Sequence, residues 1–248
     1  DNKQIRLMNC PFDRMTLSDT VSAIFNIVNS GGRGWFCTVN VAILMMMRSD
    51  ARLQRFVDQS AVVVADGQPI ICLARLLGCS LPERVAGVDL VDAICERAAR
   101  DGKRIYLLGA TDSVVAKVAD RQRSRFPGLQ VDYADGYFSA DSAANRADRI
   151  RSSGAAILFV GMGVPRQEIF IEEQWDRLGV NIAIGVGGSF DVLSGLRARA
   201  PRWMQQIGME WFFRLLQEPR RLFVRYLVTN SQFVWLAVWA VLTGKRSS

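Results

Sequence analysis

The sequence predicts an α/β fold in which a Rossmann-like parallel sheet is flanked by helices and followed by a C-terminal helical appendage. Short apolar runs rich in Val, Ile and Phe alternate with longer segments of helical spacing, and each run ends in a polar or glycine-rich cluster. The chain has 248 residues, 50% of them hydrophobic, which suits one α/β core domain with an appendage. From about residue 197 onward the strand rhythm stops, so we expect helices only.

The elements of the core follow one another in a βα order. Five apolar runs are predicted to be strands, at 34–39, 61–65, 104–108, 155–160 and 181–186. The segments of helical spacing between them predict helices at 41–59, 88–100, 111–126, 140–152 and 165–178. Near-continuous apolar strands are typical of a parallel sheet that is covered on both faces. We therefore expect a core domain at 1–196 and an appendage at 197–248.

The predicted appendage combines arginines with aromatic residues. Its first half contains at least six arginines and is interrupted by Pro201, Gly208 and Pro219, whereas 226–244 carries no charge. A membrane-spanning helix needs about 20 predominantly apolar residues. The apolar stretch here is 233–242, so we expect a membrane-associating interfacial helix on an anionic surface. A helix packed on the core or on another subunit is the alternative.

Composition excludes several kinds of site. The chain has no histidine, which excludes Ser-His-Asp triads, Cys-His dyads and zinc sites that need imidazole. An acid or base must therefore be a carboxylate, Lys, Tyr or Cys. The five cysteines form no C-x-x-C pair and lie in largely apolar surroundings, so we expect them to be reduced and buried, as in a cytoplasmic protein. The N-terminus lacks the pattern of a secretory signal.

A polar cluster follows each predicted strand. In a parallel sheet, ligands bind outside the carboxyl ends of the strands, where helix N-termini and loop amides converge. We expect these clusters to outline one cleft. In chain order they contain Thr38 and Asn40, then Asp66, then Gly109, then Gly161, Gly163, Arg166 and Gln167, and finally Gly187, Gly188 and Asp191.

The fourth cluster, GMGVPRQE, is related to the dinucleotide-binding pattern G-x-G-x-x-G but has Arg166 at the third glycine position. Pro165 suits the first turn of a helix. We expect glycine amides and the helix N-terminus to face an anion, with Arg166 and Gln167 adding donors. The pattern therefore favours a phosphate site over a standard NAD site, and an ordinary tight turn is the alternative. The Walker A motif is missing from the sequence.

Two charged residues are candidates for chemistry. Asp66 follows the apolar run AVVVA, and a positioned general base contributes about 10²- to 10⁴-fold to a rate. The alternative, which the sequence favours equally, is that Asp66 only forms a turn or caps a helix before Gly67. Arg84 is suited to a phosphate, to a sugar or to a surface carboxylate. No D-x-D motif occurs, so the counter-charge for a leaving diphosphate would come from the appendage arginines and the glycine-loop amides.

Six ordered blocks resemble the WecG/TagA/CpsF glycosyltransferases, family 26, across nearly the whole chain: TVNVAILMMMRSD, VVVADGQPI, ERVAGVD, LFVGMGVPRQE, GVGGSFDVLSG and APRWMQQIGMEWFFRLLQEPRRLFVRYL. The resemblance implies an inverting enzyme without metal or cofactor. It would transfer a sugar from a UDP-sugar to a polyprenyl-diphosphate-linked saccharide in cell-surface polysaccharide synthesis. The donor would be UDP-N-acetylmannosamine or its uronic acid, or UDP-glucose in an exopolysaccharide pathway. The enzyme would be peripheral, at the cytoplasmic face of the bacterial cytoplasmic membrane.

The resemblance also implies roles by motif position. Asp66 would deprotonate the acceptor hydroxyl in a single in-line displacement. Thr38 and Asn40 would line the sugar and acceptor pocket, Arg84 would approach the diphosphate or sugar, and Gln167 would contact the donor. The nucleotide site would comprise Gly109, Gly161, Gly163, Arg166, Gly187, Gly188 and Asp191. Arg214, Arg221 and Arg225 would fold over the cleft and stabilise the departing UDP. The apolar tail after Arg225 matches no family motif.

Two other classes of function stay open on the sequence alone. One is a non-catalytic nucleotide- or lipid-binding module at the membrane. The other is nucleic-acid binding, for which a net charge of +7 is modest, and the basic residues interleave with tryptophans beside an apolar tail, so we expect no nucleic acid as a partner. Oligomeric state is left open, with a homo-oligomer among the partners considered.

Overall fold

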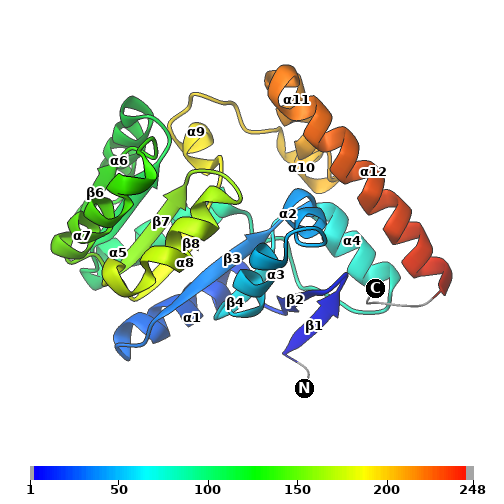
Figure 1. Cartoon of the computed structure of the whole chain (residues 1–248), viewed down its shortest axis with the longest axis horizontal. Helices are drawn as coiled ribbons and strands as arrows, with labels where there is room; N and C mark the ends of the chain where they lie inside the picture. Colours follow the sequence, from blue (N-terminus) through cyan, green and yellow to red (C-terminus); the bar gives the residue numbers. More distant parts are fainter. Residues whose placement is uncertain (1–2, 244–248) are drawn as a thin grey trace. The chain divides into compact units, whose positions relative to one another are not determined.

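The computed structural model describes residues 3–243, and within this range it describes only the backbone of Arg221 and Arg225. Helices flank a six-stranded parallel sheet with the order β4-β3-β8-β7-β5-β6 (Figure 1). The strands are β3 (Gly34–Val39), β4 (Val62–Ala65), β5 (Ile105–Gly109), β6 (Val131–Ala134), β7 (Ile157–Gly161) and β8 (Ile182–Gly185). The predicted fold class is therefore confirmed, and five of the six strands lie where the apolar runs predicted them.

The chain folds into two compact units. The first unit contains 1–16, 38–86 and 198–248, and the second contains 17–37 and 87–197. Both units are therefore discontinuous in sequence. The division into a core at 1–196 and an appendage at 197–248 stays a prediction.

The second unit contains the central strands of the sheet. Strands β7 and β8 pair in parallel, as do β5 and β7, and Gly109 at the end of β5 lies opposite Gly161 at the end of β7. Residues Ile157 to Val160 are fully buried, as expected of a strand that is covered on both faces. The helices of this unit are α1 (Leu17–Asn29), α5 (Gly87–Asp101), α6 (Asp112–Arg125), α7 (Ala143–Ser153), α8 (Arg166–Leu178) and α9 (Ser189–Leu193).

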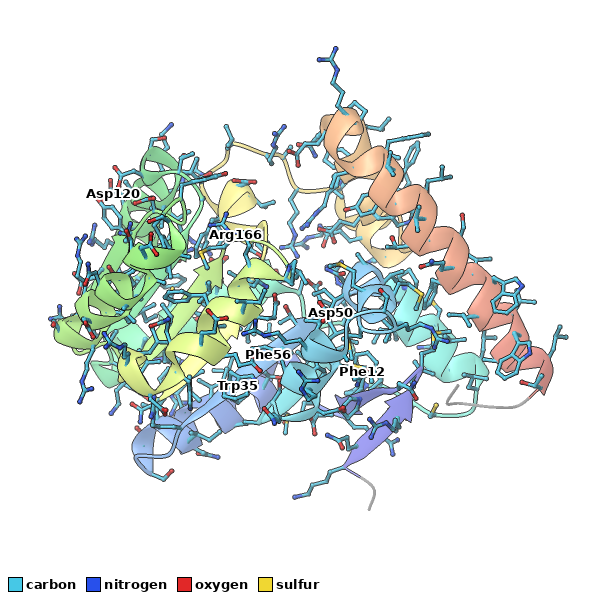
Figure 2. All side chains as sticks on the ribbon, in the orientation of Figure 1. Phe12, Trp35, Asp50, Phe56, Asp120 and Arg166 are labelled. Atoms are coloured by element: carbon cyan, nitrogen blue, oxygen red, sulfur yellow. The ribbon has the colours of Figure 1, made fainter. Side chains whose placement is uncertain are left out.

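The first unit opens with an antiparallel hairpin of β1 (Gln4–Leu7) and β2 (Cys10–Asp13). Phe12 of β2 and Phe56 of the helix α3 (Ala51–Asp58) are both buried (Figure 2). The Asp13 carboxylate accepts a hydrogen bond from the Val63 amide of β4 at 2.8 Å, and its burial raises the pKa of Asp13 above the ordinary value. A half-buried carboxylate thus ties the hairpin to β4.

The predicted helix at 41–59 is wrong, because the segment forms two helices, α2 (Val41–Met46) and α3 (Ala51–Asp58). Asp50, labelled in Figure 2, is the N-cap of α3 and accepts hydrogen bonds from the amides of Arg52 and Leu53 at 2.9 and 3.0 Å. An N-cap carboxylate satisfies amides that a helix start would otherwise leave unpaired. It therefore begins a new helix inside the apolar pattern. The next helix, α4 (Gln68–Leu76), follows β4.

The C-terminal helices are α10 (Arg202–Gln206), α11 (Glu210–Gln217) and α12 (Pro219–Thr243). Helix α12, orange to red in Figure 1, packs on α2 and buries Leu222, Phe233, Leu236 and Ala240. The segment Leu222–Thr243 is long and apolar enough to cross a membrane by length and composition alone. The predicted C-terminal apolar helix is confirmed up to Thr243, and residue 244 of the predicted segment lies outside the described residues.

Four of the five cysteines are buried, as the sequence predicts: Cys10, Cys37, Cys79 and Cys95. Burial raises the pKa of the Cys95 thiol, so this side chain is protonated at neutral pH. The expectation is wrong for Cys72, which is exposed. The helical repeat places Cys72 on the exposed face of α4 with Arg75 and Leu76, whereas its neighbours Ile71 and Leu73 are buried.

Candidate functional site

Asp66 lies where β4 ends and α4 begins. The four residues of β4 are buried, whereas Asp66 is half-buried. The Asp66 amide donates to the carbonyl of Val39 at the end of β3, at 2.9 Å. The N-cap residue of α4 is Gly67, so Asp66 directly precedes the cap position of that helix. The role of Asp66 as a base, and the alternative of a turn former or helix cap, both stay predictions.

Thr38 and Asn40 frame the end of β3. Thr38 is buried with 7% of its surface exposed, and Asn40 is half-buried. The Asn40 side-chain oxygen caps α2 by accepting from the Ile43 amide at 3.1 Å. Capping fixes the orientation of the Asn40 amide group beside the start of α2. The pocket roles of both residues stay predictions.

Arg84 is placed beside the end of β4 by its neighbour Val85, whose amide donates to the Ala65 carbonyl at 2.9 Å. The guanidinium of Arg84 forms an ion pair with Glu210 of α11 through Nη1 and donates to Gln205 Oε1 of α10 at 3.0 Å through Nη2. The other oxygen of Glu210 lies 3.4 Å from Arg214 Nη2. The structure therefore brings Arg84 and Arg214 together around one carboxylate.

Sequence reasoning missed Glu210 and Gln205. The four-residue spacing from Glu210 to Arg214 is a detectable signal, because side chains at i and i+4 meet on a helix. No sequence signal links either residue to Arg84, 126 positions from Glu210 and 121 from Gln205. Arg221 and Arg225 lie in α12, but their side chains are outside the described part, and their predicted role stays a prediction.

In the second unit the predicted glycines occur at closely packed strand ends. Gly109 has a φ of +149°, and a Cβ atom there would lie 2.4 Å from the Gly161 carbonyl oxygen. A Cβ on Gly161 would lie 2.6 Å from the ring of Phe190. Only glycine fits such distances, so both residues allow the ends of β5, β7 and α9 to approach one another. Gly163 follows with a φ of +79°, just before α8.

Gln167 in the first turn of α8 is buried, with 2% of its surface exposed. Its side-chain oxygen accepts from the Gly187 amide at 3.0 Å, and its nitrogen donates to Glu168 Oε1 at 2.8 Å. Gln167 thus connects the loop after β8 to α8. The Gly187 amide, which the sequence predicts to serve the nucleotide, donates to a side chain. The predicted contact between Gln167 and the donor stays a prediction.

Arg166 is exposed at the start of α8, and its Nη2 donates to the Gly136 carbonyl at 3.1 Å in the loop after β6 (Figure 2). Gly188 is the exposed N-cap of the short helix α9, and Asp191 is half-buried in its first turn. The predicted site residues are divided between the two units. The second unit contains Arg166, Gly188, Asp191, Gly109, Gly161, Gly163, Gln167 and Gly187. The first unit contains Thr38, Asn40, Asp66, Arg84 and Arg214. The single cleft stays a prediction.

Within residues 3–243, no group of three or more Cys, Asp or Glu side chains is suited to a metal ion. Metal independence stays a prediction. The first unit instead contains Asp66 at the end of β4 and, around Glu210, the guanidinium groups of Arg84 and Arg214. A carboxylate is suited to proton removal and guanidinium groups to binding an anion.

Comparison with known proteins gives the family. The model of the glycosyl transferase WecG/TagA/CpsF family matches residues 5–247. The chain is 33% identical over 212 residues to N-acetylglucosaminyldiphosphoundecaprenol N-acetyl-beta-D-mannosaminyltransferase from Bacillus spizizenii, which covers 85% of this chain and 79% of that relative. The non-catalytic module considered for the sequence is therefore set aside. The predicted resemblance is confirmed, and the chain belongs to the WecG/TagA/CpsF family of glycosyltransferases.

Proposed function

We propose that this enzyme transfers a sugar from a UDP-sugar to a polyprenyl-diphosphate-linked saccharide in bacterial cell-surface polysaccharide synthesis. The observation that carries the proposal is the relative with 33% identity over 85% of the chain, whose name gives a transfer of N-acetylmannosamine to N-acetylglucosaminyldiphosphoundecaprenol. N-acetylmannosamine is accordingly the first choice of sugar. Its uronic acid and glucose are the other donors to test.

The proposed mechanism is a single in-line displacement with Asp66 as general base. The acceptor oxygen bonds to the anomeric carbon while the bond from that carbon to the UDP oxygen breaks. The acceptor proton passes to the Asp66 carboxylate, and the electron pair leaves with UDP, so an α-linked donor gives a β-linked product. The half-buried position of Asp66 at the end of β4, fixed by the bond to Val39, supports this role.

Two arginines are suited to the departing diphosphate. UDP gains negative charge as the glycosidic bond breaks, and preorganised donors stabilise such a charge without reorganising. Arg84 is 13% exposed and Arg214 is 37% exposed at the side chain, and both are held through Glu210. In this proposal their guanidinium groups provide the counter-charge that a divalent metal supplies in other sugar-nucleotide enzymes.

The lipid-linked acceptor requires a membrane surface, and α12 has a face that suits one. While one face of α12 packs on α2, the side chains of Trp235, Val238 and Leu242 are 67%, 54% and 81% exposed. An exposed apolar helix face preceded by arginine is typical of an interfacial helix. We therefore place the enzyme peripherally at the cytoplasmic face, where anionic lipids attract basic residues.

The test is to incubate the purified protein with a panel of UDP-sugars and a short-chain polyprenyl-diphosphate N-acetylglucosamine, with a chelator present. We expect one donor, UDP-N-acetylmannosamine first, to give a β-linked disaccharide, identified by mass and by the anomeric NMR coupling. Absence of product from every UDP-sugar would contradict the proposed reaction. Product that appears only after adding a divalent metal would contradict the proposed role of the arginines.

A further inference from the structure

The contacts around Arg84 point to a positioning residue that neither the motifs nor the family comparison identifies. We propose that Glu210 holds Arg84 and Arg214 in one fixed arrangement, so that the two guanidinium groups bind the diphosphate of the donor together. The inference rests on the proposed function for the identity of the ligand. It assigns to Glu210 a role through the arginines and no contact with the reacting atoms.

Glu210 uses its two oxygens separately. Oε2 pairs with Arg84, which comes from the loop before α5, and Oε1 lies 3.4 Å from Arg214, one turn further along α11. The Glu210 side chain is 17% exposed and that of Arg84 is 13% exposed, so the pair lies largely out of water. Ion pairs in such surroundings are stronger than surface pairs and their geometry is better fixed.

Gln205 fixes the same guanidinium from a second direction. Its oxygen accepts from Arg84 Nη2 at 3.0 Å, while its nitrogen donates to the Ala200 carbonyl at 2.7 Å. Arg84 is therefore held by α10 as well as by α11. A guanidinium has five N–H donors, and these two contacts engage only part of them. The restrained orientation is what a site for a planar, bidentate contact with phosphate needs.

Charge explains why a carboxylate is required at this position. Arg84 and Arg214 carry like charges and approach the same side chain, so without an anion between them they repel each other. A long side chain such as that of the partly exposed Arg214 would then turn toward solvent. The diphosphate would have to order both arginines when it binds, which weakens binding because side-chain entropy is lost at that step.

The experiment compares the dissociation constants of UDP and uridine for the full-length wild type, Glu210→Gln and Glu210→Asp. Glu210→Gln keeps the shape but removes the charge, and Glu210→Asp keeps the charge but is too short to reach both arginines. We expect Glu210→Gln to weaken UDP binding by about 10- to 100-fold, the range for charge-assisted hydrogen bonds, and to leave uridine binding unchanged. The UDP dissociation constant of Glu210→Asp should lie between those of the wild type and Glu210→Gln.

The matched control is Asp58→Asn, which removes a carboxylate from an ion pair with Arg6 in the same unit and should change neither constant. Melting temperatures show whether each variant is folded. A purely structural role of Glu210 would weaken UDP and uridine binding alike, whereas a positioning role weakens UDP binding alone. Unchanged UDP binding in Glu210→Gln would overturn the inference. Tighter UDP binding would also overturn it, since Glu210 would then compete with the diphosphate. Failure of the wild type to bind UDP would instead contradict the proposed donor class.

Discussion

At the scale of single residues, Asp66 carries the proposed chemistry, and Asp66→Asn tests it. The substitution keeps the size of the side chain and the backbone bond to Val39, but removes the proton acceptor. Turnover should fall by about 10²-fold or more, while UDP affinity stays the same. The measurement is steady-state turnover with the soluble acceptor, together with a UDP titration. Asp148→Asn, which alters an exposed ion pair with Arg177, is the control and should keep wild-type turnover. Full turnover by Asp66→Asn would assign the base to another group.

The residues of the site differ in how far the sequence could predict them. Asp66 and Gly161 stand directly after apolar runs, so their places at strand ends followed from the pattern alone. Gln167 was predicted at the start of a helix, but its bonds to Glu168 and Gly187 depend on the packing of α8 against the loop after β8. Such contacts between distant segments have no local signal in one sequence. The ion pair between Arg84 and Glu210 could not be predicted for the same reason.

At the scale of elements, the exposed face of α12 makes a prediction about lipid binding. Trp235→Ser combined with Val238→Ser removes apolar surface from that face and leaves the side packed on α2 intact. Full burial of such a side chain is worth about 1.5 to 3 kcal/mol, so partitioning onto vesicles should fall by about tenfold or more. The measurement is flotation with vesicles containing anionic phospholipid. Leu196→Ser, an exposed apolar residue outside α12, should float like wild type. Equal flotation of the double variant would exclude this face as the lipid contact.

The hairpin contact at Asp13 predicts a pH dependence of stability. Burial raises the pKa of Asp13 in the folded protein above 3.8, so the folded state binds the proton more tightly than the unfolded chain. The free energy of unfolding should therefore fall, relative to Asp13→Asn, as pH rises from about 3.8 through the raised pKa. We expect a difference of less than about 1 kcal/mol, because the carboxyl is partly exposed. Urea unfolding between about pH 4 and 7 measures it.

Asp13→Ala separates charge from hydrogen bonding at this contact. It removes the acceptor for the Val63 amide as well as the charge, so it should lower the free energy of unfolding across the whole range by about 1 kcal/mol or more. Asp13→Asn retains an acceptor oxygen and should not. If wild type and Asp13→Asn run parallel from pH 4 to 7, the carboxyl does not titrate as burial predicts.

The observed bounds of the helices and strands show which elements a local sequence pattern could predict. The strand at 34–39 was predicted with its observed bounds, because an apolar run bounded by glycine and asparagine is unambiguous. The helix α1 has buried residues at Val21, Ile24, Phe25 and Val28, a helical spacing that the sequence contains but that was not assigned. Strands β1, β2 and β6 mix polar with apolar residues, as QIRL, CPFD and VDYA, so they contain no continuous apolar run like that of β4. Their pairing partners are what stabilise them.

At the scale of the whole molecule, chain order does not follow the compact units. The C-terminal residues 198–248 group with 1–16 and 38–86 in the first unit. The composition of the sequence changes near residue 197, where arginines and tryptophans become frequent and the alternation of apolar runs with helical segments stops. It could not reveal that Arg84 pairs with Glu210 or that α12 packs on α2. The contacts of Gln205 and Glu210 make α10 and α11 part of the surroundings of Arg84.

Removal of residues 198–248 tests whether the C-terminal helices act in catalysis or only in membrane binding. The truncated chain loses the partners of Arg84 and the helix that covers α2, so its melting temperature should fall. Turnover with a soluble short-chain acceptor should fall by about 10²-fold or more, because the arginines that stabilise the leaving group are lost.

Two full-length variants keep this test of the C-terminal helices decisive if the truncated chain fails to fold. Arg214→Ala removes one guanidinium near Glu210 and should lower turnover with the soluble acceptor by about tenfold or more, at an unchanged melting temperature. The double variant Trp235→Ser and Val238→Ser should retain that turnover, because its changes lie on the exposed face of α12 and a soluble acceptor needs no vesicle. Full turnover by both the truncated chain and Arg214→Ala would confine the C-terminal helices to membrane attachment.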